Sequence, residues 1–129
     1  MHFAGAKLML FLGEDLVVLR RDHKPGIPYP GMLDFPGGGR EGDERPEDCA
    51  RRETFEEVGL CIPEGALTWR RAHGESWFFA AHLPQDRIRD VVWGGEGEGW
   101  MMMPPDVFVA RDDAIPHFRE MLSAYLAGV

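Results

Sequence analysis

The sequence predicts an α/β protein in which helices cover both faces of a mixed central β-sheet, that is, an α/β/α sandwich. Strand-like apolar segments and helical segments follow one another in the order strands, helix, strands, helix, which is the order expected for this packing. The chain has 129 residues, of which 44% are hydrophobic. That length and that hydrophobic content predict a single domain over residues 1–129.

The N-terminal part is expected to form a β-hairpin followed by a stiff loop. Residues 5–12 are an apolar segment typical of a buried strand, and residues 16–20 form a second strand after a Gly-Glu-Asp turn. Residues 22–31 contain three prolines and two glycines. This composition predicts a loop that is stiffer than a Gly/Ser linker.

The first helix is predicted to begin near Pro46 and to end at Gly59. Proline suits the first turn of a helix, and the acidic residues that follow it suit the positive end of the helix dipole. Glycine is the usual residue just beyond a helix C-terminus. The other expected elements are a short strand at 33–35, strands at 66–72 and 76–82, a loop at 94–99, a strand at 100–103 that ends at the Pro-Pro-Asp sequence 104–106, and an amphipathic helix at 114–127.

The net charge and the cysteine content of the chain exclude several classes of function. The formal net charge is −8, which argues against a stable nucleic-acid partner, because such proteins carry a basic surface. Cys49 and Cys61 have neither zinc-site nor disulfide-framework spacing, so we expect reduced core thiols in a cytoplasmic protein. The apolar run at 8–12 is too short to span a membrane, and no signal peptide is expected.

Three glutamates gather on one side of the first predicted helix. Glu53, Glu56 and Glu57 fall within an arc of about 100° on an ideal helix, where like charges repel one another. A solvated surface would explain them, but a cluster of hard oxygen ligands also suits Mg²⁺ or Mn²⁺. Phe55 and Val58 lie roughly opposite the glutamates and are expected to be buried.

Residues 38–60 resemble the signature of the Nudix hydrolases. The signature requires a glycine, an acid, an Arg-Glu pair, a Glu-Glu pair and a final glycine followed by an apolar residue, all at fixed spacing. Thr54 departs from it, since an aliphatic residue is usual there. The resemblance implies the Nudix fold and, with the approach at 33–38 and the C-terminal helix, the MutT-type branch. The matching residues are Gly38, Glu44, Arg52, Glu53, Glu56, Glu57, Gly59 and Leu60.

The resemblance also implies roles for these residues in a metal-dependent hydrolysis. Enzymes of this family cleave the pyrophosphate of a nucleoside diphosphate linked to another moiety, with Mg²⁺ or Mn²⁺. By the resemblance, Glu56, Glu57 and the Gly37 carbonyl match metal ligands, Glu53 matches a ligand or the general base, Arg52 matches the residue that orients the glutamates, and Glu44 matches the partner of that arginine.

The expected site also includes residues outside the signature, and Gly38 of the signature has a further expected role in it. Family members often add an acid from a later loop, and Glu96 fits that position best, with Glu98 as the alternative ligand or base. Arg21, rather than Arg20, is expected to contact phosphate. Gly38 is expected to let the backbone approach metal and phosphate closely. Trp77 is a candidate for stacking on the base, as are Phe35, Phe79, Trp93 and Trp100.

Three functional hypotheses remain at this point. The first is a MutT-type enzyme acting on nucleoside triphosphates, although Asp112 and Asp113 stand where oxidised-guanine specificity would use an amide. The second is a Nudix enzyme for dinucleoside polyphosphates, nucleotide sugars, ADP-ribose or RNA 5′ ends. The third is a non-catalytic nucleotide-sensing module, which the retained motif glutamates disfavour. A monomer or a homodimer that acts on a small nucleotide is expected.

Overall fold

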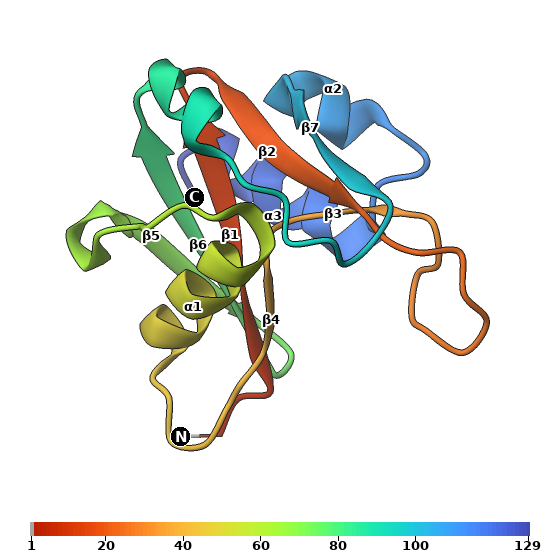
Figure 1. Ribbon diagram of the computed structural model, residues 1–129, viewed down its shortest axis with the longest axis horizontal. Coiled ribbons are helices and arrows are strands. Elements are labelled where there is room, and N and C mark those ends of the chain that lie inside the picture. Colours follow the sequence, from red (N-terminus) through yellow and green to blue (C-terminus); the bar gives the residue numbers. More distant parts are fainter. Residues whose placement is uncertain (1) are drawn as a thin grey trace.

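The structure, a computed structural model, describes residues 2–129 and confirms the predicted α/β class, with a mixed sheet between helices (Figure 1). The strands are β1 (Gly5–Leu12), β2 (Asp15–Arg20), β3 (Leu33–Asp34), β4 (Gly37–Gly39), β5 (Trp69–His73), β6 (Ser76–Leu83) and β7 (Gly99–Met103). The helices are α1 (Pro46–Val58), α2 (Pro105–Ala110) and α3 (Pro116–Leu126), and single 3₁₀ segments occupy Glu64–Ala66 and Gln85–Asp90.

β1 and β2 are paired over only part of their length, and this feature of the sheet positions the site. β1 runs parallel to β6 along its whole length, but it pairs with β2 only beside the hairpin turn, at Phe11↔Leu16 and Leu12↔Asp15. Farther from that turn, residues 33–39 lie between the two strands: β3 pairs with the end of β2, and β4 pairs with the start of β1. We call residues 33–39 the inserted segment.

The helices cover the two faces of the sheet, and side-chain alternation along the strands builds a core on each face. Leu8, Leu10 and Val17 pack on the α1 side, with Cys49, Ala50 and Val58 of that helix. Met9, Phe11 and Val18 point to the opposite face, where α2 and α3 supply Phe108, Phe118, Met121 and Leu122 (Figure 1). Successive side chains of a strand point to opposite faces of the sheet, and helices cover both faces here. An apolar residue is therefore buried at nearly every position of a central strand such as β1.

Two of the later elements differ from the prediction. The Pro-Pro-Asp sequence was expected only to end a strand, yet it begins α2, with Pro105 in the first turn and Asp106 at the positive end of the helix. The strand predicted at 66–72 begins at Trp69, because residues 64–66 form a 3₁₀ turn.

Two expectations about burial were wrong. Phe55 is 53% exposed, because the buried stripe of α1 runs through Ala50, Thr54 and Val58 and leaves Phe55 beyond its edge. Cys61 is exposed, whereas Cys49 is buried as expected. Thr54 is fully buried and its hydroxyl donates to the Ala50 carbonyl at 2.7 Å, so its polar group is satisfied within the core.

Candidate active site

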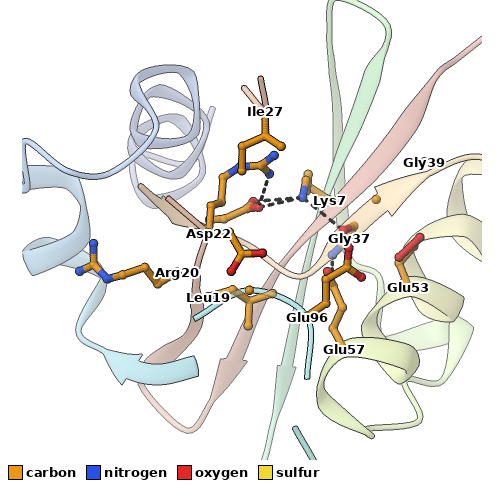
Figure 2. Close-up of a pocket in the computed structure, with 14 residues that line it drawn as sticks. Lys7, Leu19, Arg20, Asp22, Ile27, Gly37, Gly39, Glu53, Glu57 and Glu96 are labelled. Carbon is orange, nitrogen blue, oxygen red and sulfur yellow. Dashed lines mark hydrogen bonds and ion pairs between the residues drawn. The ribbon is translucent and has the colours of Figure 1, made fainter. Parts of the chain in front are cut away.

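A pocket of about 290 Å³ lies where the inserted segment, α1 and the loop before β7 meet. Figure 2 shows Glu53, Glu57 and Glu96 on one side of it and Arg20 extending away from them. The lining residues are Lys7 of β1, Leu19 and Arg20 of β2, Arg21, Asp22 and Ile27 of the following loop, Asp34 and Gly37 to Gly39 of the inserted segment, Glu53 and Glu57 of α1, and Glu96 and Gly97 before β7.

Glu57 is the most strongly perturbed acid in the pocket. Its Oε1 accepts a hydrogen bond from the Gly37 amide at 2.7 Å. Burial raises the pKa of Glu57 to about 8, and the Gly37 amide and the charge of Lys7 offset only part of that effect. Gly37 has a φ of +139°, and a Cβ there would lie 2.2 Å from the Ala6 carbonyl oxygen, so only glycine fits this contact.

Glu53 lies one helical turn before Glu57 and packs directly on the backbone of Gly38. A Cβ at Gly38 would lie 2.6 Å from the Glu53 carboxyl carbon, so the glycine makes room for the carboxylate. Burial also raises the pKa of Glu53, against the lowering effect of the nearby Arg52 charge. An acid with a raised pKa beside a pocket is a suitable proton acceptor.

Arg52 joins four acids to the backbone of the inserted segment. Its guanidinium binds both oxygens of Glu44, at 2.6 and 3.0 Å, and donates to the Gly39 carbonyl at 2.9 Å. Its Nη1 lies 3.2 Å from Glu56, 3.3 Å from Glu53 and 3.4 Å from Glu41. The hydrogen bonds from Arg52 lower the pKa of Glu44. The Arg52 and Glu44 side chains are partly buried, at 22% and 14% exposed, and their contact is bidentate, so the pair is more than a fully exposed ion pair and its placement fits the expected orienting role.

Glu56 is not in the pocket. Its side chain is 52% exposed and points to Arg52, so one of the expected metal ligands lies away from the others. Within residues 2–129, no group of three or more His, Cys, Asp or Glu side chains is close enough together to hold a metal ion. The donor set still fits a hard divalent cation: carboxylates and a backbone carbonyl are available, and a cation would offset the unfavourable burial of Glu57.

The floor of the pocket holds a charged cluster that sequence reasoning missed in part. Asp34 is 5% exposed, and its carboxylate contacts Lys7 Nζ at 3.0 Å and Arg21 Nη1 at 2.9 Å. Arg21 was expected at the pocket, but Lys7 and Asp34 were not among the expected site residues. The sequence does indicate this cluster in one way: Lys7 stands in an otherwise apolar strand, where a charge without a partner is rare, so a counter-charge is expected nearby.

The loop before β7 places its two acids differently. Glu96 lines the pocket, whereas the Glu98 carboxylate contacts Nδ1 of His23 in the opposite loop. The Gly94 amide donates to the Glu57 carbonyl at 2.9 Å, and the Glu98 amide donates to the Arg20 carbonyl at 2.9 Å, so both α1 and β2 hold this loop.

Trp77 lies outside the pocket. It packs against the core on the α1 side of the sheet, and the Arg70 guanidinium lies 4.6 Å from the centre of its ring. This position gives no support to a base-stacking role. None of the lining residues is aromatic, and the apolar ones are Leu19 and Ile27. Residue spacing could not show this, because the side chain that reaches the pocket depends on how β1 and β6 are paired.

Comparisons with known proteins fit this architecture. A sequence model of the NUDIX domain matches residues 1–125. The fold is similar to that of the MutT protein from Methanosarcina mazei Go1, with a TM-score of 0.74 and 17% identity over 98% of this chain and 95% of that one. It is also similar to an Ap4A hydrolase from C. elegans, with a TM-score of 0.69 and 20% identity over 97% of this chain and 98% of that one.

A third similar structure belongs to a larger protein. It is a bifunctional NMN adenylyltransferase/ADP ribose pyrophosphatase from Francisella tularensis, complexed with AMP and a Mn ion, with a TM-score of 0.66 and 12% identity over 98% of this chain and 42% of that one. At such identities the likeness establishes the fold and leaves the substrate open. No helix within residues 2–129 has the length and apolar character needed to cross a membrane.

Proposed function

The chain belongs to the NUDIX family of pyrophosphohydrolases, and from this premise we propose that it hydrolyses a nucleoside triphosphate to a nucleoside monophosphate and pyrophosphate. The observation that carries the proposal is the shared pocket of Glu53, Glu57, Glu96 and the Gly37 backbone, with cationic groups on its floor. Carboxylates can hold a divalent ion there, and the cations suit the phosphates of the substrate.

Mg²⁺ or Mn²⁺ would be held by Glu57, by the Gly37 carbonyl and by Glu56 once its side chain leaves Arg52. When bound, such an ion neutralises phosphate oxygens and lowers the pKa of a water molecule. Glu53 or Glu96 would complete the ligand set, and this assignment follows from their positions in the pocket.

The protein groups act on water and on phosphate. Water adds to one of the two phosphorus atoms, α or β, that flank the cleaved bridge of the triphosphate, and its proton passes to Glu53. The bond from that phosphorus to the bridging oxygen breaks, so that the nucleoside monophosphate and pyrophosphate are released. Arg52 holds Glu53 in position through Nη1. Glu96 is the alternative base, because it lines the same pocket and lies on the same side of it as Glu53 and Glu57.

Arg21 is proposed to bind a phosphate of the substrate. Its Nε donates to the Pro28 carbonyl and its Nη1 to Asp34, both at 2.9 Å. Across residues 2–129, Nη2 of Arg21 makes no hydrogen bond, so it remains for the ligand. Arg20 is less suitable, because it already donates to the Gly31 carbonyl and to Asp113.

The size and lining of the pocket favour a mononucleotide over a dinucleoside polyphosphate. A volume of about 290 Å³ lies at the lower end of the range for ligand pockets. Asp113 does not replace the amide expected for oxidised guanine, because Arg111 and Arg20 both bind its carboxylate and lower its pKa. We therefore propose a canonical or otherwise modified triphosphate, with Leu19 and Ile27 as the apolar contacts.

A substrate panel tests the proposal. Canonical and oxidised nucleoside triphosphates, diadenosine polyphosphates, ADP-ribose, nucleotide sugars and 5′-triphosphate RNA would be incubated with Mg²⁺, with and without chelator. Products would be separated by ion-exchange chromatography, so that release of pyrophosphate is distinguished from release of phosphate. Faster cleavage of any other class would replace the triphosphate assignment, and metal binding without cleavage of any compound would favour a nucleotide sensor.

We also propose that this activity belongs to a single domain of residues 1–129 that acts in the cytoplasm, as a monomer or a homodimer. Sedimentation analysis at several protein concentrations would distinguish the two assembly states.

A further inference from the structure

Lys7 is a charged residue in a strand that is otherwise closed to solvent. Every other residue of β1 is buried, and the Lys7 side chain is itself only 16% exposed. On one side its ammonium lies 5.7 Å from the centre of the Phe118 ring, and on the other side it lines the pocket (Figure 2). A buried lysine is unfavourable unless oxygen acceptors replace its hydration, so its partners explain its position.

Three residues supply oxygen acceptors to the Lys7 ammonium. Nζ lies 3.0 Å from Asp34 Oδ1 and 3.3 Å from Asp34 Oδ2, 3.2 Å from the Gly37 carbonyl oxygen and 3.4 Å from the Phe35 carbonyl oxygen. An ammonium has three donors, so these acceptors use all of them. Lys7 therefore has no donor left for a substrate phosphate, which distinguishes it from Arg21.

The same oxygen atoms would attract a metal ion if the ammonium were absent. Carboxylate and carbonyl oxygens are the ligands of hard divalent cations, and the Gly37 carbonyl is also an expected metal ligand of the proposed function. With Lys7 present, one of those oxygens is shared with a fixed positive charge. A second cation near Asp34 is then repelled by Lys7 as well as by Arg21.

We propose that Lys7 occupies the cation position at Asp34 and thereby confines the divalent metal to the side of the pocket formed by Glu53 and Glu57. This inference rests on the proposed function, because it concerns where that reaction's metal is held. Lys7 acts as a positioning residue: it fixes Asp34 and the Gly37 carbonyl, and it keeps a second metal ion away from the pocket floor.

Metal stoichiometry tests the inference without any substrate. Free Mn²⁺ would be measured by electron paramagnetic resonance during titration of the wild type, Lys7→Ala, Lys7→Met and Lys24→Ala. Both Lys7 variants are expected to bind about one more Mn²⁺ per chain than the wild type, because an oxygen-lined position loses its cation. Lys24→Ala makes the same charge change on a side chain that is 71% exposed, and it should match the wild type.

Two further experiments test whether the additional Mn²⁺ is bound at Asp34. The Lys7→Ala/Asp34→Asn double variant removes its carboxylate ligand and is expected to lose the additional Mn²⁺. n-Propylammonium replaces the stem and charge that Lys7→Ala removes, so it should displace the additional ion from that variant and leave the wild type unchanged. n-Propanol, which lacks the charge, should have no effect.

Turnover gives an independent readout. Lys7→Ala is expected to lose about tenfold or more in kcat at high Mg²⁺, and n-propylammonium should restore most of it, as expected for a lost positioning group. An unchanged Mn²⁺ count in folded Lys7→Met would overturn the proposal. A Lys7→Ala variant in which only KM rises would also overturn it, because Lys7 would then be a phosphate contact. An inactive wild type would defeat the proposed function but would leave the Mn²⁺ comparison valid.

Discussion

Replacing Glu57 by glutamine is expected to stabilise the metal-free protein and, at the same time, to abolish most of its turnover. Glu57 is a buried acid whose pKa rises from 4.5 to about 8 in the folded state. Glutamine removes the charge and keeps an oxygen that can accept from the Gly37 amide, now at 2.7 Å from Glu57. The substitution therefore isolates the effect of the negative charge.

The sign and size of the effect follow from proton linkage. Between pH 4.5 and about 8 the folded protein keeps a proton on Glu57 that the unfolded chain has released, so the stability contributed by this group falls as the pH rises. Each pH unit corresponds to about 1.4 kcal/mol, which gives a loss of up to about 5 kcal/mol at pH 8 and no further loss above it.

Urea unfolding in the presence of a chelator, measured from pH 5 to pH 9, tests this expectation. The free-energy difference between Glu57→Gln and the wild type should grow in favour of the variant up to about pH 8 and then level off. Glu14→Gln is the matched control, because Glu14 is exposed in the hairpin turn and should show no such growth. Added Mg²⁺ should stabilise the wild type more than Glu57→Gln. A difference that stays constant with pH would refute the argument that burial leaves Glu57 without a sufficient counter-charge.

Four other substitutions test the remaining parts of the site. Gly38→Ala should reduce kcat by about tenfold or more, because the added Cβ would displace the Glu53 carboxylate, and circular dichroism should show an unchanged fold. Arg52→Lys should also lower kcat by about tenfold or more, since lysine cannot reproduce a bidentate contact; an unchanged rate would reduce Arg52 to a surface charge. Glu96→Gln should lower turnover by about tenfold or more and Glu98→Gln by much less, and the reverse order would move the loop acid to Glu98.

Local signals in the sequence predicted most of the fold and one side of the site. The fixed spacing from Gly38 to Gly59 placed Glu53 and Glu57 on a helix, and the structure brings both to one pocket. Gly59 ends that helix in the left-handed conformation, with a φ of +73°. These features depend on residues a few positions apart, so a helical period is sufficient to find them.

Features that depend on distant pairing could not be predicted in this way. Lys7, Arg21 and Asp34 meet only because β1 and β2 diverge around the inserted segment, and no local pattern indicates that divergence. The position of Trp77 outside the pocket could not be predicted for the same reason, since the face to which its side chain points depends on its register with β1. Glu56 had the right spacing, but its ion pair with Arg52 turns the side chain outward.

The inserted segment makes the backbone beside Glu53 and Glu57 part of the hydrogen-bonded sheet. The Leu8 amide donates to the Pro36 carbonyl at 2.8 Å, and β4 pairs with β1 directly beside it. Amide hydrogens there should exchange with solvent only when the sheet itself opens, whereas those of the loops at 22–31 and 93–98 can exchange through local fluctuations. We therefore expect substitutions in the two loops to change substrate preference during evolution without disturbing the backbone beside Glu53 and Glu57, which the sheet holds in place.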